Sequence, residues 1–324
     1  LLNAGDMNHK TGPNCRNIII RGRGTICGGG QELARKIIED ERARIKSFLD
    51  DNRELVESCE NSDTIPGRVR PRLINLSNCE NVWISGITLK NGPSWNVHMI
   101  YCDDIQTDHC TFVSEGVWNG DGWDPDSSTN CTLFASEFST GDDAVAIKSG
   151  KNPEGNEINR PCAHIRVFDC RSDCGHGICI GSEMSGGVED VQIWDCDLAN
   201  SLSGIEIKAT PKRGGYVRGV TVRDCITPRV MLHSVPYNDD GVPAGAPPKL
   251  EHCFFERLTL TAEVLDHDRS RHGAAPIEIA GFDKPGYEVE DIVFKDITIT
   301  KPSVALPLGL CKGVTLSNLA CVKE

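Results

Sequence analysis

One short pattern recurs along this chain and limits what the chain can fold into. In each copy a cysteine lies three residues before an apolar residue that opens a strand-like run, and a polar residue usually stands before the cysteine. After each start, apolar and polar residues alternate, which is the period of a β-strand. The chain is therefore built from an internal repeat, with copies that begin at Cys15, Cys79, Cys102, Cys131 and Cys162.

The spacing of the repeat predicts the fold class. When Val188 and Val217 are taken as the later starts, the steps from Cys79 onward are 23, 29, 31, 26 and 29 residues. Steps of this length, filled with short β-branched strands and polar or glycine turns, suit one coil of a solenoid. A sandwich or barrel would not repeat the cysteine register, and a leucine-rich solenoid would need a leucine consensus. We therefore expect an all-β chain, a right-handed parallel β-helix.

We expect a single domain over residues 1–324 with two interruptions. Residues 31–62 carry apolar residues near helical spacing, among them Leu33, Ile37 and Ile45, and predict a helical insertion. Residues 233–249 are rich in proline, glycine and aspartate and predict a long loop. No polar cap follows the last repeat, and because solenoid ends need capping we expect that part of the natural protein lies upstream.

The sixteen cysteines favour reduced, buried thiols over disulfides or zinc ligands. No Cys-x-x-Cys pair occurs, and a chain of 324 residues needs no covalent links to hold a core. Most of the cysteines share the repeat context described above. We therefore interpret them as small buried hydrophobic residues at one recurring structural position.

Charge and hydropathy narrow the set of partners. The formal net charge of −13 argues against nucleic acid and anionic membrane surfaces, and no apolar run approaches the ~18 residues of a membrane span. An anionic substrate would have to meet a local basic patch. No stretch resembles a signal peptide, so secretion and a bacterial cytoplasm both stay open. We expect a monomer.

The stretch 119–148 concentrates the acidic residues: Asp121, Asp124, Asp126, Asp142 and Asp143 lie there beside glycines and apolar runs. One interpretation is a solvated acidic loop or a site for a hard cation such as Ca²⁺. The other is a group of carboxyls for acid and base chemistry, in which the surroundings separate the pKa values. These residues alone leave both interpretations open.

Four motifs in order make the chain resemble the polygalacturonase family of glycoside hydrolases, the pectin-degrading β-helix enzymes. The resemblance covers nearly all of the chain, and each motif alone would be weak. The fourth motif, Arg-Ile-Lys in the family, is matched only in part. The motifs are Asn119-Gly120-Asp121, Asp142-Asp143, Gly175-His176-Gly177 and Glu206-Ile207-Lys208.

The resemblance implies the following roles. Asp142 is the general acid, and Asp121 and Asp143 activate the attacking water, so the anomeric centre inverts and the acid and base carboxyls lie about 6.5–9.5 Å apart. His176 orients an aspartate or tunes its proton. For both Asp142 and Asp143 to face one substrate the backbone must turn, which we expect Gly141 to permit.

Substrate binding is expected at Asn119, Lys208, Arg213 and Lys148. Lys208 is assigned to the uronate carboxylate, and Lys148 to the groove. Glu206 departs from the family, because a glutamate stands where an arginine would bind a uronate with two hydrogen bonds. Either Arg213 or Lys212 replaces that arginine, or the subsite takes a neutral sugar or an altered linkage.

Three segments resemble the exo-acting bacterial branch of the family: residues 124–128, the loop 150–161 and residues 180–187. Insertions there would close one end of an open groove and leave a pocket for chain ends, so we expect exo action.

The sequence thus predicts a cofactor-free hydrolase, without a metal, that cleaves α-1,4-galacturonosyl bonds of pectic polysaccharides or oligogalacturonides with inversion. Glu206 motivates a first alternative, a hydrolase of rhamnogalacturonan or another modified uronide. Two further alternatives change the class of protein: a Ca²⁺-dependent pectate lyase, and a non-catalytic carbohydrate-binding β-helix.

Overall fold

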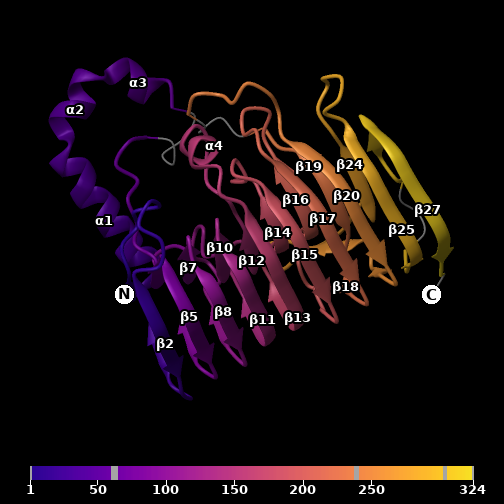
Figure 1. The fold of residues 1–324 in the computed structure, drawn as a ribbon, viewed down its shortest axis with the longest axis horizontal. Coiled ribbons are helices and arrows are strands. Elements are labelled where there is room, and N and C mark those ends of the chain that lie inside the picture. The colour runs from indigo at the N-terminus through magenta and orange to yellow at the C-terminus, as the bar shows by residue number, and fades with distance from the viewer. Residues whose placement is uncertain (1, 60–64, 237–240, 302–304, 323–324) are drawn as a thin grey trace.

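A computed structural model describes residues 2–59, 65–236, 241–301 and 305–322 of the chain. Its strands stack in chain order as successive coils of one solenoid (Figure 1). All strand pairs of the two large sheets are parallel, and connections between parallel strands of one sheet are right-handed in nearly all proteins. The predicted right-handed parallel β-helix is confirmed.

The first large sheet takes one short strand from each coil. In the described residues it contains ten strands, in the order β1 (Leu2–Ala4), β4 (Ile74–Ser77), β7 (Val97–Ile100), β10 (Trp123–Asp126), β12 (Val145–Ile147), β14 (Gly177–Gly181), β16 (Gly204–Ala209), β19 (Val230–Ser234), β24 (Ile277–Ala280) and β26 (Leu308–Gly309).

The second large sheet takes the longer strands, which wrap around the rest of each coil. Its long strands are β2 (Cys15–Arg21), β5 (Cys79–Ser85), β8 (Asp103–Asp108), β11 (Thr129–Ser139), β13 (Cys162–Cys174), β15 (Val188–Trp194), β17 (Tyr216–Arg223), β20 (Lys249–Glu256), β25 (Val289–Ile299) and β27 (Cys311–Cys321). Its short strands are β3 (Thr25–Cys27), β6 (Thr88–Lys90), β9 (Thr111–Val113), β18 (Ile226–Thr227) and β21 (Thr259–Leu260).

Each coil bends at a residue in the left-handed backbone conformation, and these residues stack in register. At the first corner φ lies between 51° and 66°. Asparagine, aspartate and glycine tolerate this conformation best, and they occupy most of the corner. The corner residues are Asn17, Asn81, Asp104, Asn130, His164, Asp190, Gly219, His252, Asp291 and Gly313.

A second corner follows on the same long strands, with φ between 48° and 73°. Its residues are Gly86, His109, Ala135, Asp169, Asp195, Asp224, Arg257, Asp296 and Asn318. The two corners leave apolar side chains facing inward on both sides of each bend, so the core forms continuous columns along the solenoid.

Many of the cysteines stand directly after a left-handed residue, at one of these two corners or at a further level that includes Asn78 and Tyr101. All sixteen are free and eleven are buried, which confirms the prediction of buried thiols. Nine of the sixteen directly follow a left-handed residue, and in eight of these nine the thiol donates to the carbonyl two residues earlier at 3.2–3.6 Å. Ser128 and Ser136 make the same contact at 2.9 Å. The single recurring position that we predicted is wrong, because cysteines occur at several levels of the coil.

The repeat register needs one correction. Cys162, Val188 and Val217 are equivalent, as predicted. Cys131 is not, because it pairs with Ile105 and Ile165. Ser128 stands at the equivalent level, which makes the steps from Cys102 to Ser128 and from Ser128 to Cys162 26 and 34 residues. The polar residue before Cys131 is itself the first corner, which explains the false match.

The helices lie at the start of the solenoid and beside its middle. The first three are α1 (Gly30–Arg44), α2 (Lys46–Asp51) and α3 (Arg53–Glu57), which form an arch outside the first coils (Figure 1). The fourth, α4 (Glu154–Ile158), lies in the loop after β12. No residue of α2 or α3 is buried. Residues 60–62 of the predicted insertion lie outside the described residues.

The predicted loop 233–249 begins inside β19 and ends at the first residue of β20, and its residues 237–240 lie outside the described part of the chain. A short antiparallel hairpin, β22 (Glu263–Leu265) and β23 (Arg271–Gly273), stands apart from both large sheets. None of the helices in the described residues is long and apolar enough to cross a membrane.

Asp104 lies at the first corner, is exposed and has a φ of 57°. Its left-handed backbone predicts that some substitutions there lower the free energy of unfolding. Asp104→Val places a β-branched residue in the left-handed region and should lower the free energy of unfolding by about 1–2 kcal/mol. Asp104→Gly is the matched control, since glycine accepts this φ. Urea unfolding of both variants measures the difference, and equal stability of the two would contradict the corner.

Candidate active site

Three of the predicted catalytic residues stack on adjacent coils at the edge of the ten-stranded sheet. Asp121, Asp143 and His176 each lie two residues before a core residue, and those three core residues pair in register: Trp123 with Val145, and Val145 with Ile178. The parallel register therefore places Asp121, Asp143 and His176 at the same level of three adjacent coils, although Asp121 and His176 are 55 positions apart in the sequence.

Gly141 is required for a reason other than the expected one. Its φ is not in the left-handed region. A Cβ at this position would instead lie 2.2 Å from the carbonyl oxygen of Val117, so the loop before the aspartate pair can pack against the preceding coil only if residue 141 lacks a side chain. The turn that exposes Asp142 depends on this close approach.

The aspartate pair is held by two basic groups. His176 Nδ1 lies 3.0 Å from Asp142 Oδ1 and 2.9 Å from Asp143 Oδ1, and Lys208 Nζ lies 3.1 Å from Asp143 Oδ2. The side chain of Asp142 is 19% exposed, whereas that of Asp143 is 3% exposed. Asp142 is thus the member of the pair that a ligand can reach.

These contacts shift the pKa of His176 and the pKa values of the two aspartates in opposite directions. Burial alone would lower the pKa of His176, but its hydrogen bonds with Asp142 and Asp143 raise that pKa to about 10. Burial opposes ionisation of both aspartates, yet His176 and Lys208 outweigh it and lower the pKa of Asp142 and of Asp143. The free site therefore keeps a proton on His176 beside two carboxylates.

A second cluster of acidic side chains surrounds Lys148. The ammonium is 3.3 Å from Glu183 Oε2, 3.6 Å from Asp121 Oδ2 and 3.8 Å from Asp124 Oδ1. Burial raises the pKa of Asp124 to about 8 although Lys148 opposes it, and burial together with Asp124 raises the pKa of Asp121 well above its usual range. Lys148 is 4% exposed, so it balances this charge instead of lining an open groove.

Glu206 has a structural role that its motif did not reveal. It is 6% exposed and accepts a hydrogen bond from His233 Nε2 at 2.7 Å, and Lys208 Nζ lies 4.0 Å from its other oxygen. Burial would raise its pKa, but His233 and Lys208 lower it to about 2. Glu206 therefore fixes Lys208, which in turn contacts Asp143.

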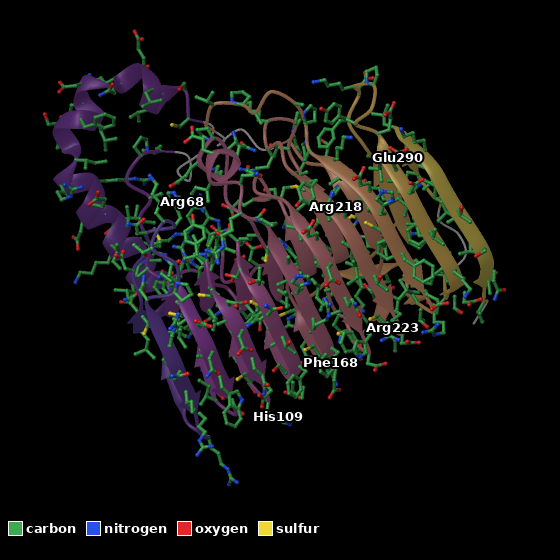
Figure 2. The ribbon with its side chains drawn as sticks, in the orientation of Figure 1. Arg68, His109, Phe168, Arg218, Arg223 and Glu290 are labelled. Carbon is green, nitrogen blue, oxygen red and sulfur yellow. The ribbon has the colours of Figure 1, made fainter. Side chains whose placement is uncertain are left out.

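Asn119 connects the acid pair to arginines that the sequence reading missed. Its Nδ2 donates to Asp142 Oδ2 at 3.0 Å, and its Oδ1 accepts from Arg70 Nη2 at 2.7 Å and from Arg68. Figure 2 shows Arg68 in the space between the α1 arch and the sheets. The signal that could have found them is the segment Arg68-Val69-Arg70-Pro71-Arg72, which concentrates three guanidinium groups within five residues of an acidic chain.

Arg213 does not occupy the position that we expected. It is 1% exposed and donates to Asn152 Oδ1 at 3.2 Å and to Ser182 Oγ at 3.3 Å. The carbonyl of Arg213 accepts from Asn156 on α4 and from Ser185. A buried guanidinium that joins three loops cannot bind a polymer, so we no longer propose it as the substitute for the arginine missing at residue 206.

The hairpin β22–β23 reaches back over the site from later in the chain. The ring of His267 lies edge-on to that of His176, with centroids 5.4 Å apart. Arg269 pairs with Glu115 at 2.7 Å and donates to the carbonyl of Asp173 at 3.1 Å. Loops from three separate coils therefore meet beside His176.

One group in the described residues could supply metal ligands: the ligand atoms of Asp142, Asp143 and His176 lie within 4.8 Å of one another. The donor set fits a cation poorly, because protonated His176 has no lone pair at Nδ1 to offer and Lys208 already contacts Asp143. The arrangement suits proton exchange between an imidazole and two carboxyls.

Comparison with known proteins gives a family match and relatives of longer sequence. The model of "Glycosyl hydrolases family 28" matches residues 4–235. A "Probable polygalacturonase" of Vitis vinifera is 42% identical over 48% of this chain and 32% of its own length. An "Exo-poly-alpha-D-galacturonosidase" of Dickeya chrysanthemi is 23% identical over 98% of this chain and 56% of its own length. The chain thus spans about a third to somewhat more than half of these relatives.

The fold is also similar to a solved structure, a hyperthermoactive exopolygalacturonase from Thermotoga maritima. The TM-score is 0.73 and the identity 23%, over 95% of this chain and 70% of that one. At this identity the likeness concerns the fold.

The raised pKa of His176 predicts a pH dependence of stability. The native state binds this proton more tightly than the unfolded state, so the stabilisation is complete below pH ~6.5 and is lost as pH rises toward about 10. The wild type should lose on the order of 2–5 kcal/mol relative to His176→Gln between pH 6 and pH 10. Urea unfolding at both pH values measures this, with His9→Gln at an exposed position as control. A gap that does not change with pH would contradict the proton on His176.

Proposed function

This chain belongs to the glycosyl hydrolases of family 28, and we propose that it hydrolyses α-1,4-galacturonosyl bonds of pectic polymers or oligogalacturonides with inversion. The observation that carries the proposal is the stack of Asp121, Asp143 and His176 on adjacent coils, with the more exposed Asp142 at its centre. Glycoside hydrolysis requires one carboxyl group that donates a proton and a second carboxylate that is ionised, and this stack brings carboxyls together with a protonated imidazole.

In the proposed reaction Asp142 gives its proton to the glycosidic oxygen while the bond from the anomeric carbon to that oxygen breaks. Water adds to the opposite face of the anomeric carbon and loses a proton to a carboxylate. Asp143, whose pKa is lowered, is the ionised base in this proposal, and Asp121 helps to hold the water. Asp121 Oδ1 is buried without a hydrogen-bond partner in the described part of the chain, and in this proposal it accepts a hydrogen bond from the attacking water. The separation of about 6.5–9.5 Å expected between acid and base is wrong for Asp142 and Asp143, because both contact His176 and an oxygen of each lies within 4.8 Å of the other.

His176 supplies the proton to Asp142. In the free site the pKa of Asp142 is lowered, so its carboxyl is charged at neutral pH and the proton rests on the imidazole 3.0 Å away. A bound uronate adds negative charge and excludes water, and both changes favour the neutral carboxyl. The proton then moves from Nδ1 to Oδ1 of Asp142, where the leaving oxygen can take it.

We propose exo action because the loop after β12 contacts the loops that follow β14 and β19. Asn152 donates to the carbonyl of Val242 at 3.0 Å, and Asn156 donates to that of Ser185 at 3.1 Å. The name of the Dickeya chrysanthemi relative supports the same choice. We further propose that the protein acts as a monomer without a cofactor, and not on nucleic acid or membranes.

A modified uronide such as rhamnogalacturonan is the second candidate substrate. Glu206 favours it, because the arginine expected there is replaced by a buried carboxylate that already engages His233 and approaches Lys208. A neutral sugar next to the scissile bond would not need that arginine.

A product time course separates these candidates. Polygalacturonate, oligogalacturonides and rhamnogalacturonan are digested while reducing ends and ultraviolet absorbance are followed together. Monomer or dimer alone from the start, without absorbance, is the expected result. An unsaturated, absorbing product would mean a lyase, and release only from rhamnogalacturonan would select the second candidate.

Asp142→Asn tests the acid. The amide keeps the shape of the carboxyl but cannot give up a proton, so kcat should fall about 10²–10⁴-fold with little change in thermal unfolding temperature. Asp283→Asn, at an exposed position, makes the same change of charge and should keep full activity. Activity within tenfold of the wild type would remove Asp142 from the acid role.

A further inference from the structure

The segment between α3 and β4 brings three arginines to the site. Arg68, Arg70 and Arg72 alternate with Val69, which is 55% exposed, and with Pro71. Arg68 and Arg70 contact Trp118 and Asn119, so these two arginines face the site, whereas Val69 faces solvent. The next residue, Leu73, is fully buried, which anchors this segment to the core.

Two of these arginines converge on one tryptophan and one amide. The guanidinium carbon of Arg68 lies 3.9 Å from the ring centre of Trp118, and that of Arg70 lies 4.7 Å from it. Arg70 Nη1 donates to the carbonyl of Trp118 at 2.9 Å. Arg68 and Arg70 both donate to Asn119 Oδ1. Stacking and hydrogen bonds together fix both guanidinium planes.

Asn119 links this arginine pair to Asp142, the proposed general acid. The other end of the Asn119 amide, Nδ2, donates to Asp142 Oδ2 at 3.0 Å. Arg68, Arg70, Trp118 and Asn119 are all half-buried, so each keeps some solvent exposure, as the side chain of Asp142 does.

The opposite side of the site cannot supply the same recognition. There Glu206 occupies the place of the expected arginine, Lys208 is bound to Asp143, and Arg213 is buried. A polyuronate carries one charge on every unit, and this protein has a net charge of −13. Its carboxylates therefore need a fixed cationic surface near the scissile bond.

We propose that Arg68 and Arg70, on the face of Trp118, form a subsite that binds the carboxylate of a hexuronate unit beside Asp142. The planar guanidinium groups match a carboxylate in shape and in hydrogen-bond geometry. This subsite rests on the proposed function, because it assigns where the acidic sugar of that reaction is held. It also explains how a chain with Glu206 can accept uronates.

The test compares charged and neutral substrates. Arg68→Gln and Arg70→Gln are assayed on trigalacturonate and on its methyl ester, with Arg35→Gln on the exposed face of α1 as a control with the same loss of charge. We expect KM for trigalacturonate to rise at least tenfold, kcat to change less than threefold, and KM for the ester to stay within twofold. Arg35→Gln should match the wild type on both.

Loss of activity on the charged and neutral substrates alike would overturn the subsite, since it would show that the arginines only support the fold or Asn119. An unchanged KM would overturn it as well. Calorimetric binding of D-galacturonate separates this inference from the proposed function. If the wild type hydrolyses no uronide, the proposed function fails, and the subsite stands only if galacturonate binds the wild type and Arg35→Gln but not Arg68→Gln or Arg70→Gln.

Discussion

The left-handed corner residues are the constraint on which the structure depends. A parallel coil can stack on the next only if both bend at the same level, and the stacked residues from Asn17 to Gly313 provide that bend. The register they impose brings Trp123, Val145 and Ile178 level with one another. The catalytic geometry follows from this, because each acidic or basic side chain has a fixed offset from its level in the core. The cysteines follow as well, since a small thiol fits behind the bend and donates to its carbonyl.

Balance of charge is the second requirement of the site. The buried carboxylates repel one another, and burial raises the cost of ionising each. Lys148, Lys208 and His176 each lie between two or more of these carboxyls. The result is a divided site in which the aspartate pair is charged, while Asp121 and Asp124 resist ionisation. Within the charged pair it is exposure that separates the proposed acid from the proposed base, because a ligand can reach Asp142 whereas Asp143 is buried.

The fold could be predicted from sequence because the repeat marks every coil, and the motifs around Asp121, Asp142 and His176 identified a compact site. Contacts made by insertions could not be predicted. Arg68 reaches Asn119 across 51 residues, and no local pattern encodes such a distance. Glu206 was misjudged for a related reason: its partner His233 comes from the next coil, 27 residues later. Register errors such as Cys131 arose where two levels of the coil carry the same residue types.

The hairpin β22–β23 changes how this solenoid is expected to unfold. In a simple stack each coil touches only its neighbours, so the ends can fray while the middle survives. The pair Arg269–Glu115 joins residues 154 positions apart, and Arg271 donates to Asn200 Oδ1 at 2.6 Å. These contacts link a later coil directly to the coils that hold the aspartates. Unfolding in this region should consequently be cooperative over several coils, and a loss of order near residue 270 should also affect the candidate active site, where His267 contacts His176.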